Sequence, residues 1–178
     1  MATEPNRANG PSGTDFSQFG GETSFDIVSP FLESAPVNLD GVAEALGLLI
    51  FEVDTFQHDE SGRIKRIFDS DKILYVIEIN NHHSENRRRF TLAHEISHYL
   101  LHRDKIGDGV TDDTLYRSRL GDIIETEANR LAAQLLMPRM LVRTLFRSGM
   151  RSLSDLCKMF KVSEAAMRIR LKQLRLDA

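Results

Sequence analysis

Three residues of the types that bind and activate metal ions stand together in the stretch FTLAHEISHYLLH, at positions 90–102. His94 and His98 are four residues apart, so on a helix their imidazoles lie on one face, one turn apart, and can reach the same ion. Glu95 can reach a water held by that ion. This H-E-x-x-H arrangement is typical of sites in which two histidines bind zinc and the glutamate acts as a general base toward a peptide carbonyl.

The same pentapeptide also occurs by chance in ordinary amphipathic helices, because only three of its five positions are fixed. Its surroundings favour the metal-site interpretation. Phe90, Ala93, Ile96 and Leu100 give the segment apolar residues at helical spacing, and a predicted strand ending in IEIN comes shortly before it.

A catalytic zinc site needs a third protein ligand and one open position. His102 lies two helical turns beyond His94, about 12 Å away at 1.5 Å per residue, so the three histidines cannot converge on one ion. We expect His102 at the surface near the helix C-terminus, where the dipole favours a cation. Asp104 follows His98 by six residues, but a ligand there needs a glycine at position 101, which is leucine.

The remaining candidates are two carboxylates on a second predicted helix, Glu125 and Glu127. The residues three and four positions from Glu127 are Ile123, Ile124, Arg130 and Leu131; those from Glu125 are Gly121, Asp122, Ala128 and Asn129. The more apolar surroundings place Glu127 nearer the core, where an unpaired carboxylate is costly and therefore meets a cation. We predict Glu127 as the third ligand, with Glu125 as the fallback. The alternative for Glu127 is a salt bridge to Arg117 or Arg130.

The elements that must position these side chains are three strands followed by helices. Short runs of β-branched and aromatic residues predict strands at 48–53, 63–68 and 72–80. Helices are expected at 87–102, at 122–137 before Pro138, in the segment 139–149, at 153–160, and at 164–174 with Ser163 as N-cap. The expected fold is α+β: a small, mainly antiparallel or mixed sheet packed on the H-E-x-x-H helix, with a helical C-terminal region.

The chain divides into three parts on composition. Residues 1–24 are rich in Gly, Ser, Thr, Pro and Asn and are predicted to form a disordered tail, residues 25–150 a metal-binding domain, and residues 151–178 a helical pair resembling a helix-turn-helix. The last part holds seven Lys or Arg and three Asp or Glu, so DNA binding is an alternative for it. Against DNA binding, Lys161 replaces the usual turn glycine.

The bulk composition excludes several other classes of protein. The net charge of −3 points to neither nucleic acid nor membrane as a partner, and the single cysteine, Cys157, excludes an intramolecular disulfide and a thiolate metal cage. There is no long apolar run and no secretory leader pattern, so we expect a cytoplasmic protein. The three arginines at 87–89 suggest a docking patch or, alternatively, salt bridges to the acidic loop 108–113 and the following helix.

Two long motifs, RRRFTLAHEISHYLLH and ETEANRLAAQLLMP, resemble the ImmA/IrrE metallopeptidases. The resemblance runs from about Val37 to the C-terminus. It implies a zincin-like fold in which His94, His98 and Glu127 bind zinc and Glu95 is the base, although Ser97 stands where many members have glycine. It also implies a protein target, a helix-turn-helix transcriptional repressor that is cleaved or inactivated.

The sequence thus predicts a zinc endopeptidase of restricted specificity, with Mn²⁺ as the alternative metal. Two imidazoles and a carboxylate favour zinc. The competing hypotheses are a non-proteolytic metal-binding regulator that binds a repressor or DNA, and an antitoxin-like partner of a toxin.

Overall fold

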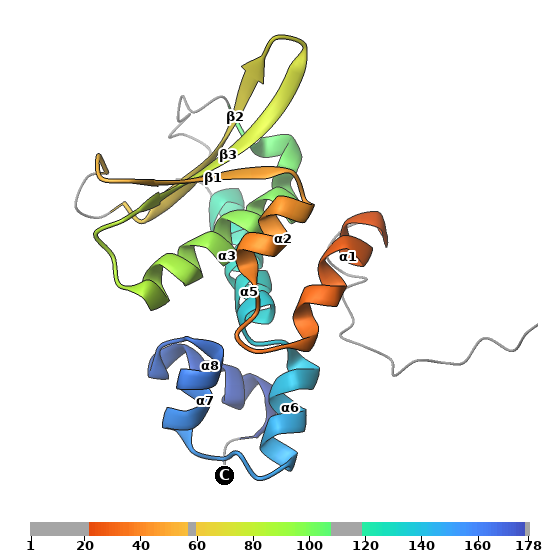
Figure 1. The fold of residues 1–178 in the computed structure, drawn as a ribbon, viewed down its shortest axis with the longest axis vertical. Coiled ribbons are helices and arrows are strands. Elements are labelled where there is room, and N and C mark those ends of the chain that lie inside the picture. Colours follow the sequence, from red (N-terminus) through yellow and green to blue (C-terminus); the bar gives the residue numbers. More distant parts are fainter. Residues whose placement is uncertain (1–21, 57–59, 108–118, 177–178) are drawn as a thin grey trace, which may run out of the picture.

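The computed structural model describes residues 22–56, 60–107 and 119–176. Three strands and a set of helices form an α+β fold, as predicted (Figure 1). The N-terminal elements are α1 (Glu22–Val28), η1 (Ser29–Glu33), α2 (Leu39–Ala45), β1 (Leu48–Val53), β2 (Gly62–Asp69) and β3 (Lys72–Asn80). The remaining elements are α3 (Glu85–His102), η2 (Arg103–Lys105), α5 (Arg119–Leu136), α6 (Arg139–Arg147), α7 (Leu153–Phe160) and α8 (Glu164–Leu174).

The sheet has the order β1-β3-β2, with β1 parallel and β2 antiparallel to β3. It is therefore mixed. The central strand carries the core: Tyr75, Ile77 and Ile79 are buried toward the helices, and Val76 is buried on the other face. Burial on both faces is typical of a strand with a continuous apolar run, here residues 73–77. Strand β2 forms one edge of the sheet, and it is the edge next to the predicted metal site.

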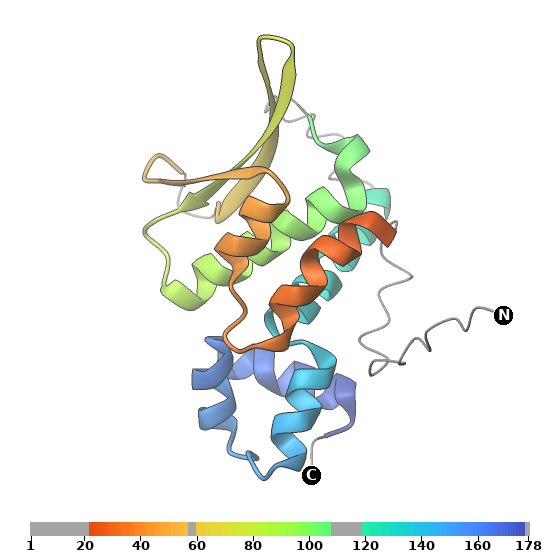
Figure 2. The ribbon, with the colours of Figure 1, turned by 45° about the vertical axis from the view of Figure 1, so that its right-hand side comes forward.

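Helices α2, α3 and α5 lie on one side of the sheet, and α1 runs alongside them (Figures 1 and 2). The first turn of α3 is tied to three different parts of the chain. Arg87 donates to Ser61 Oγ, Arg88 pairs with Glu52 at 2.7 Å, and Arg89 donates to the Val37 carbonyl. Each of the three arginines thus has a partner within the described part of the chain. The acidic loop 108–113, which the sequence offered as another partner, lies outside the described residues. The three arginines fix the entry of the metal-site helix to β1 and to the loop before α2.

Strand β2 approaches α3 very closely at its first residue. A Cβ atom at Gly62 would lie 2.5 Å from Thr91 Cγ2 and 2.7 Å from the Glu78 carbonyl oxygen. Thr91 lies one helical turn before the pair His94 and Glu95. Only glycine therefore allows the edge strand to lie this near to the metal-site helix.

The C-terminal helices α6, α7 and α8 gather at the end of the molecule away from the sheet (Figure 1). Ser163 accepts a hydrogen bond from the Ala166 N–H at 3.2 Å, so the predicted N-cap of α8 is confirmed. Lys161 ends α7 in the left-handed region, with φ of 51°, where a glycine is usual in a helix-turn-helix. Arg170 is buried, and its Nε donates to the Met137 carbonyl at 2.9 Å, next to the end of α5.

The end of the expected tail differs from the prediction. Residues 22–24, placed in a disordered tail, belong to α1, and η1 follows directly; Val28 and Leu32 bury these elements against the core. The rest of the expected tail, residues 1–21, lies outside the described residues, as does Arg117. Within the described ranges, no helix combines the length and the apolar character that crossing a bilayer requires.

Candidate metal centre

Helices α3 and α5 bring the candidate ligands together. Ala93 and Ser97 on α3 are fully buried, as is Ala128 on α5, so small side chains separate the two backbones and allow close approach. The Ser97 hydroxyl donates to the Ala93 carbonyl at 2.7 Å within α3 and needs no partner across the interface. The small residue between the two histidines thus has a packing role.

His94, His98 and Glu125 form a cluster of potential ligand atoms. The Nε2 atoms of the two histidines are 2.9 Å apart, and each lies 3.3 Å from a different oxygen of the Glu125 carboxylate. These three residues form the group whose ligand atoms lie close enough to hold one metal ion among the described residues. His98 is buried, and His94 and Glu125 are partly buried, so the cluster is not fully enclosed.

The spacing fits a tetrahedral ion. Bonds of about 2.0–2.1 Å at a tetrahedral angle separate neighbouring ligand atoms by about 3.3–3.4 Å. The observed separations of 2.9, 3.3 and 3.3 Å need only a small outward movement of the two imidazoles. Two nitrogens and a carboxylate are also a donor set that suits zinc. The residues present therefore fit a bound divalent cation.

The choice of Glu127 over Glu125 as the third ligand does not agree with this geometry. Glu127 Oε2 lies 3.0 Å from His102 Nε2, and half of the Glu127 side chain is exposed. The prediction ranked the two glutamates by apolar neighbours, but Ile123 is itself exposed. The inward stripe of α5 runs instead through Gly121 and Ala128, and these small residues flank Glu125. The face of α5 that turns inward here is therefore marked by small side chains and not by apolar ones.

His102 also departs from expectation. It is 6% exposed, so it is a buried residue and not a surface histidine at the helix end. Its Nδ1 lies 3.4 Å from Nδ1 of His98, and its Nε2 faces Glu127. It does not join the ligand cluster, as the 1.5 Å rise of a helix predicted. Asp104, in η2, has a side chain that is 75% exposed and pairs with Lys105.

The negative charge of Glu125 is stabilised by the two histidines that face it. Hydrogen bonds from His94 and His98 hold the pKa of the Glu125 carboxyl well below its usual range, despite its partial burial. Burial disfavours the charged form of His94, but its hydrogen bond to Glu125 and the nearby charges of Glu95 and Glu125 outweigh burial and raise its pKa. Burial and the neighbouring histidines lower the pKa of His98. The Glu125 carboxylate and the His98 imidazole, which loses its proton easily, therefore face the same position between the two helices.

Glu95 lies beside the cluster and faces the edge strand. It is 7% exposed, and burial raises its pKa to about 7, although the charge of His94 and the Ile64 backbone oppose the rise. A carboxyl group with a pKa near neutrality can both take up and release a proton at physiological pH. This is the property that a general acid–base residue needs.

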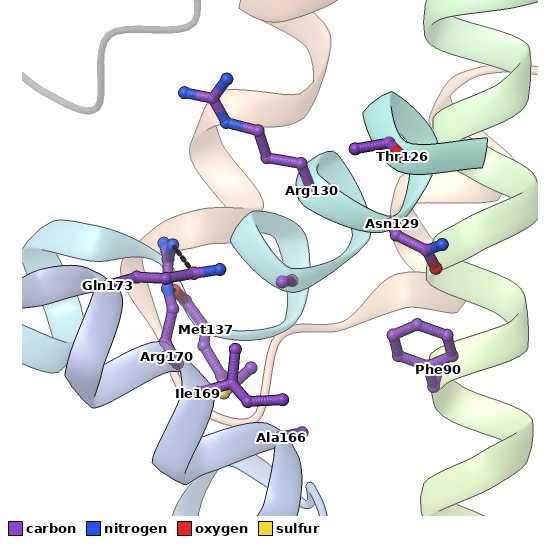
Figure 3. Close-up of a pocket in the computed structure, with 10 residues that line it drawn as sticks. Phe90, Thr126, Asn129, Arg130, Met137, Ala166, Ile169, Arg170 and Gln173 are labelled. Atoms are coloured by element: carbon purple, nitrogen blue, oxygen red, sulfur yellow. Dashed lines mark hydrogen bonds between the residues drawn. The ribbon is translucent and has the colours of Figure 1, made fainter. Parts of the chain in front are cut away.

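A cavity of about 500 Å³ opens beside the cluster, between α3, α5 and α8 (Figure 3). Phe90, which stacks on His94 with ring centroids 6.2 Å apart, forms one wall. Ile169, 60% exposed, and Arg170 approach from α8 on the other side. The cavity therefore connects the neighbourhood of His94 with the C-terminal helices.

Comparison with known proteins agrees with this geometry. A family model for the peptidase M78 family, described as the IrrE N-terminal-like domain, matches residues 43–172 and so continues through residue 150 into α8. Two proteins named radiation response metalloprotease IrrE are similar in sequence. The one from Deinococcus deserti is 44% identical over 94 residues, which are 50% of this chain and 33% of that protein. The one from Deinococcus radiodurans is 38% identical over 96 residues, 51% and 29% of the two chains.

The chain aligns with about a third of the length of these relatives. Among solved structures, a Mycobacterium tuberculosis transcriptional regulator shares the fold, with a TM-score of 0.53 and 19% identity over 88% of this chain and 48% of that one. The family match covers well over half of the chain and includes all of α3 and α5. With the H-E-x-x-H helix and the carboxylate of α5 in place around one point, the chain belongs to the peptidase M78 family of IrrE N-terminal-like domains.

Proposed function

We propose that this protein is a zinc-dependent endopeptidase of restricted specificity. The observation that carries the proposal is the convergence of His94, His98 and Glu125 within metal-binding distance, with the buried Glu95 beside them. His94, His98 and Glu125 would hold the ion. Mn²⁺ is the alternative, but the two nitrogen ligands favour zinc.

A bound divalent cation would make a water acidic enough to lose a proton near neutral pH and would polarise a peptide carbonyl. The other parts of the reaction fall to the protein. Glu95 accepts the proton at its carboxylate and returns it to the leaving amine, for which a pKa of about 7 in the metal-free protein is well suited. Its burial holds the carboxylate in one place and keeps bulk water away from it.

The substrate is proposed to be a helix-turn-helix transcriptional repressor. A protein substrate in extended conformation can pair with the outer edge of β2, the edge that faces away from β3 and borders Glu95 through the Ile64 backbone. The Arg66 N–H donates to the Gly107 carbonyl at 2.9 Å, so we place the substrate on the part of this edge that lies beside Glu95. A side chain of the substrate would then enter the cavity next to His94.

The test is cleavage of a repressor by the metal-loaded protein. The purified chain, loaded with Zn²⁺ or Mn²⁺, is incubated with the helix-turn-helix repressor encoded beside its own gene, and the products are resolved by gel and mass spectrometry. Glu95→Gln should retain the metal and lose cleavage, because the amide cannot accept the proton. Cleavage by Glu95→Gln at the wild-type rate would remove Glu95 from the mechanism. Loss of repression with the repressor intact would refute the peptidase function.

A further inference from the structure

The cavity between α3, α5 and α8 is large enough for a small ligand, and its walls are mostly apolar (Figure 3). Its volume of about 500 Å³ lies within the range of ordinary ligand pockets. The apolar side chains that line it are Phe90, Ala133, Met137, Ala166 and Ile169. Because Phe90 stacks on His94, one part of the cavity lies beside the candidate metal cluster. A ligand that fills the cavity must therefore be apolar over most of its surface.

The charged side chains that line the cavity are positive. Of the ten described residues around it, Arg130 and Arg170 are basic and none is acidic. Arg170 is 6% exposed, and Gln173 lies beside it on the α8 side of the cavity (Figure 3). Charge complementarity thus favours a ligand that also carries a negative group.

The guanidinium group of Arg170 has more donors than partners. Such a group carries five N–H donors. Its Nε donates to the Met137 carbonyl at 2.9 Å, and its Nη1 lies 3.5 Å from Gln173 Oε1, which is long for a hydrogen bond. Its Nη2 is buried and has no hydrogen-bond partner in the described part of the chain. The bond to Met137, just beyond the end of α5, accounts for Nε and leaves both terminal nitrogens for another acceptor.

Within the described ranges, no carboxylate compensates the charge of Arg170. Burial, together with the nearby charges of Arg139 and Arg143, lowers the pKa of Arg170 to about 10, so the group is still charged at neutral pH. Arg143 itself donates to the Leu174 carbonyl at 3.4 Å. A buried charge is costly unless an opposite charge or hydrogen-bond acceptors compensate it. An anionic group of a ligand would supply that compensation.

We propose that this cavity binds a carboxylate carried on an apolar stem, and that Arg170 is the residue that recognises the carboxylate. The apolar walls would contact the stem. The exposed side chain of Gln173 would move aside, and the carboxylate would take its place at the terminal nitrogens, which present the fork that suits two carboxylate oxygens. A carboxylate fits mostly apolar walls better than a phosphate, because it brings less charge to be removed from water.

Two sources offer this chemistry: an acidic side chain of a protein substrate, and a free carboxylic acid. The first source rests on the proposed function, in which a substrate side chain enters this cavity beside His94. The second source does not depend on peptidase activity. The ligand chemistry and the role of Arg170 are the same in both.

The test compares hexanoate with hexanamide, which has the same stem and nearly the same shape but no charge. Each is titrated into the ¹⁵N-labelled full chain at neutral pH, with a chelator present and again with Zn²⁺ added. Hexanoate should shift the amide signals of Phe90, Ala133 and Ile169, and it should bind at least about tenfold more tightly than hexanamide. The difference should be the same with and without the metal.

The matched variants are Arg170→Gln and Arg168→Gln. Glutamine at position 170 places an amide nitrogen where Nε of the arginine was, so the bond to the Met137 carbonyl is kept and only the terminal nitrogens and the charge are lost. Arg170→Gln should weaken hexanoate binding by about 10–100-fold. Arg168 is exposed on the same helix and does not line the cavity, so Arg168→Gln should bind hexanoate as the wild type does.

Three results would overturn the inference: equal binding of hexanoate and hexanamide, wild-type hexanoate binding by folded Arg170→Gln, and hexanoate binding that requires Zn²⁺. If Arg170→Gln does not fold, a second pair decides. Ile169 is 60% exposed at the cavity wall, so Ile169→Asp and Ile169→Asn should both fold. The aspartate variant should bind hexanoate more weakly than the asparagine variant, and equal binding would overturn the inference.

The source of the carboxylate is decided by competition. A blocked five-residue alanine peptide with glutamate at its centre should displace hexanoate if the cavity receives substrate side chains, and the same peptide with glutamine should not. Hexanoate binding that neither peptide disturbs would identify a free carboxylic acid as the ligand. None of these measurements needs cleavage. A protein that binds hexanoate through Arg170 but cleaves no repressor would therefore refute only the proposed function.

Discussion

Replacing Glu125 by glutamine should remove one metal ligand while leaving the fold intact. The Glu125 carboxylate lies 3.3 Å from Nε2 of both His94 and His98, and glutamine keeps its shape without its charge. Structural zinc sites with four ligands bind with about 10–16 kcal/mol, or about 2.5–4 kcal/mol for each ligand. At 1.4 kcal/mol per factor of ten, we expect zinc affinity to fall between about 10²- and 10³-fold.

The assay is competition for Zn²⁺ between the metal-free protein and a chromophoric chelator at neutral pH. Asp122→Asn is the matched control, because it removes the same charge from an exposed position one turn earlier on α5. It should bind zinc within about threefold of wild type, since exposed charges at this distance are screened. Glu127→Gln should lie between the two.

Two results would refute the reasoning. One is a Glu125→Gln variant with wild-type zinc affinity and a native circular dichroism spectrum. The other is a loss in Glu127→Gln as large as the one predicted for Glu125→Gln, which would return the ligand role to Glu127 and require α5 to turn about its axis on metal binding.

Four further predictions concern zinc binding, its proton release and the C-terminal helices. Zinc at about 1,000 times its Kd should stabilise the protein by about 4 kcal/mol and raise the Tm by about 8–16 °C in calorimetry; no rise would mean no site. The pKa of His94 is raised and that of His98 is lowered, so acidification should protonate His94 first. Just below the pKa of His94, zinc binding should therefore release about one proton per ion, not two. Calorimetry in buffers of different ionisation enthalpy measures this number. Lys161→Gly should stabilise the protein to urea by about 1 kcal/mol, because glycine adopts the positive φ without strain, whereas Lys161→Ala should give no gain. Arg170→Ala should cost about 1.5–3 kcal/mol by loss of its bond to the Met137 carbonyl, and Arg168→Ala, at an exposed site, should be neutral.

Local patterns predicted most of the elements because their signals are local. The apolar run of residues 73–77, the cap at Ser163 and the stop at Pro138 depend on neighbours within a few residues. Each strand and long helix begins and ends within a few residues of its predicted bounds. The parallel pairing of β1 with β3 was not predicted. The direction in which β1 pairs with β3 depends on how β2 folds back on β3, and the residues of a single strand do not determine it.

The sequence favoured Glu127 as the third ligand, whereas the structure brings Glu125 to the two histidines, and the reason is different. Hydrophobicity pointed to Glu127, whereas the buried residues that flank Glu125 on α5 are the small Gly121 and Ala128. The stripe of small residues was visible in the sequence and could have been used. The burial of His102 could not be foreseen, because it depends on Glu127 arriving from another helix.

The bare α-carbon at position 62 offers a way to disable this protein without altering any reactive group. An added methyl would collide with the side chain of Thr91 and with a backbone oxygen of β3, which cannot rotate away. The strand would have to lift, and the gap between β2 and α3 would widen. Gly62→Ala would therefore change the position of the edge strand beside Glu95 while leaving His94, His98 and Glu125 in place.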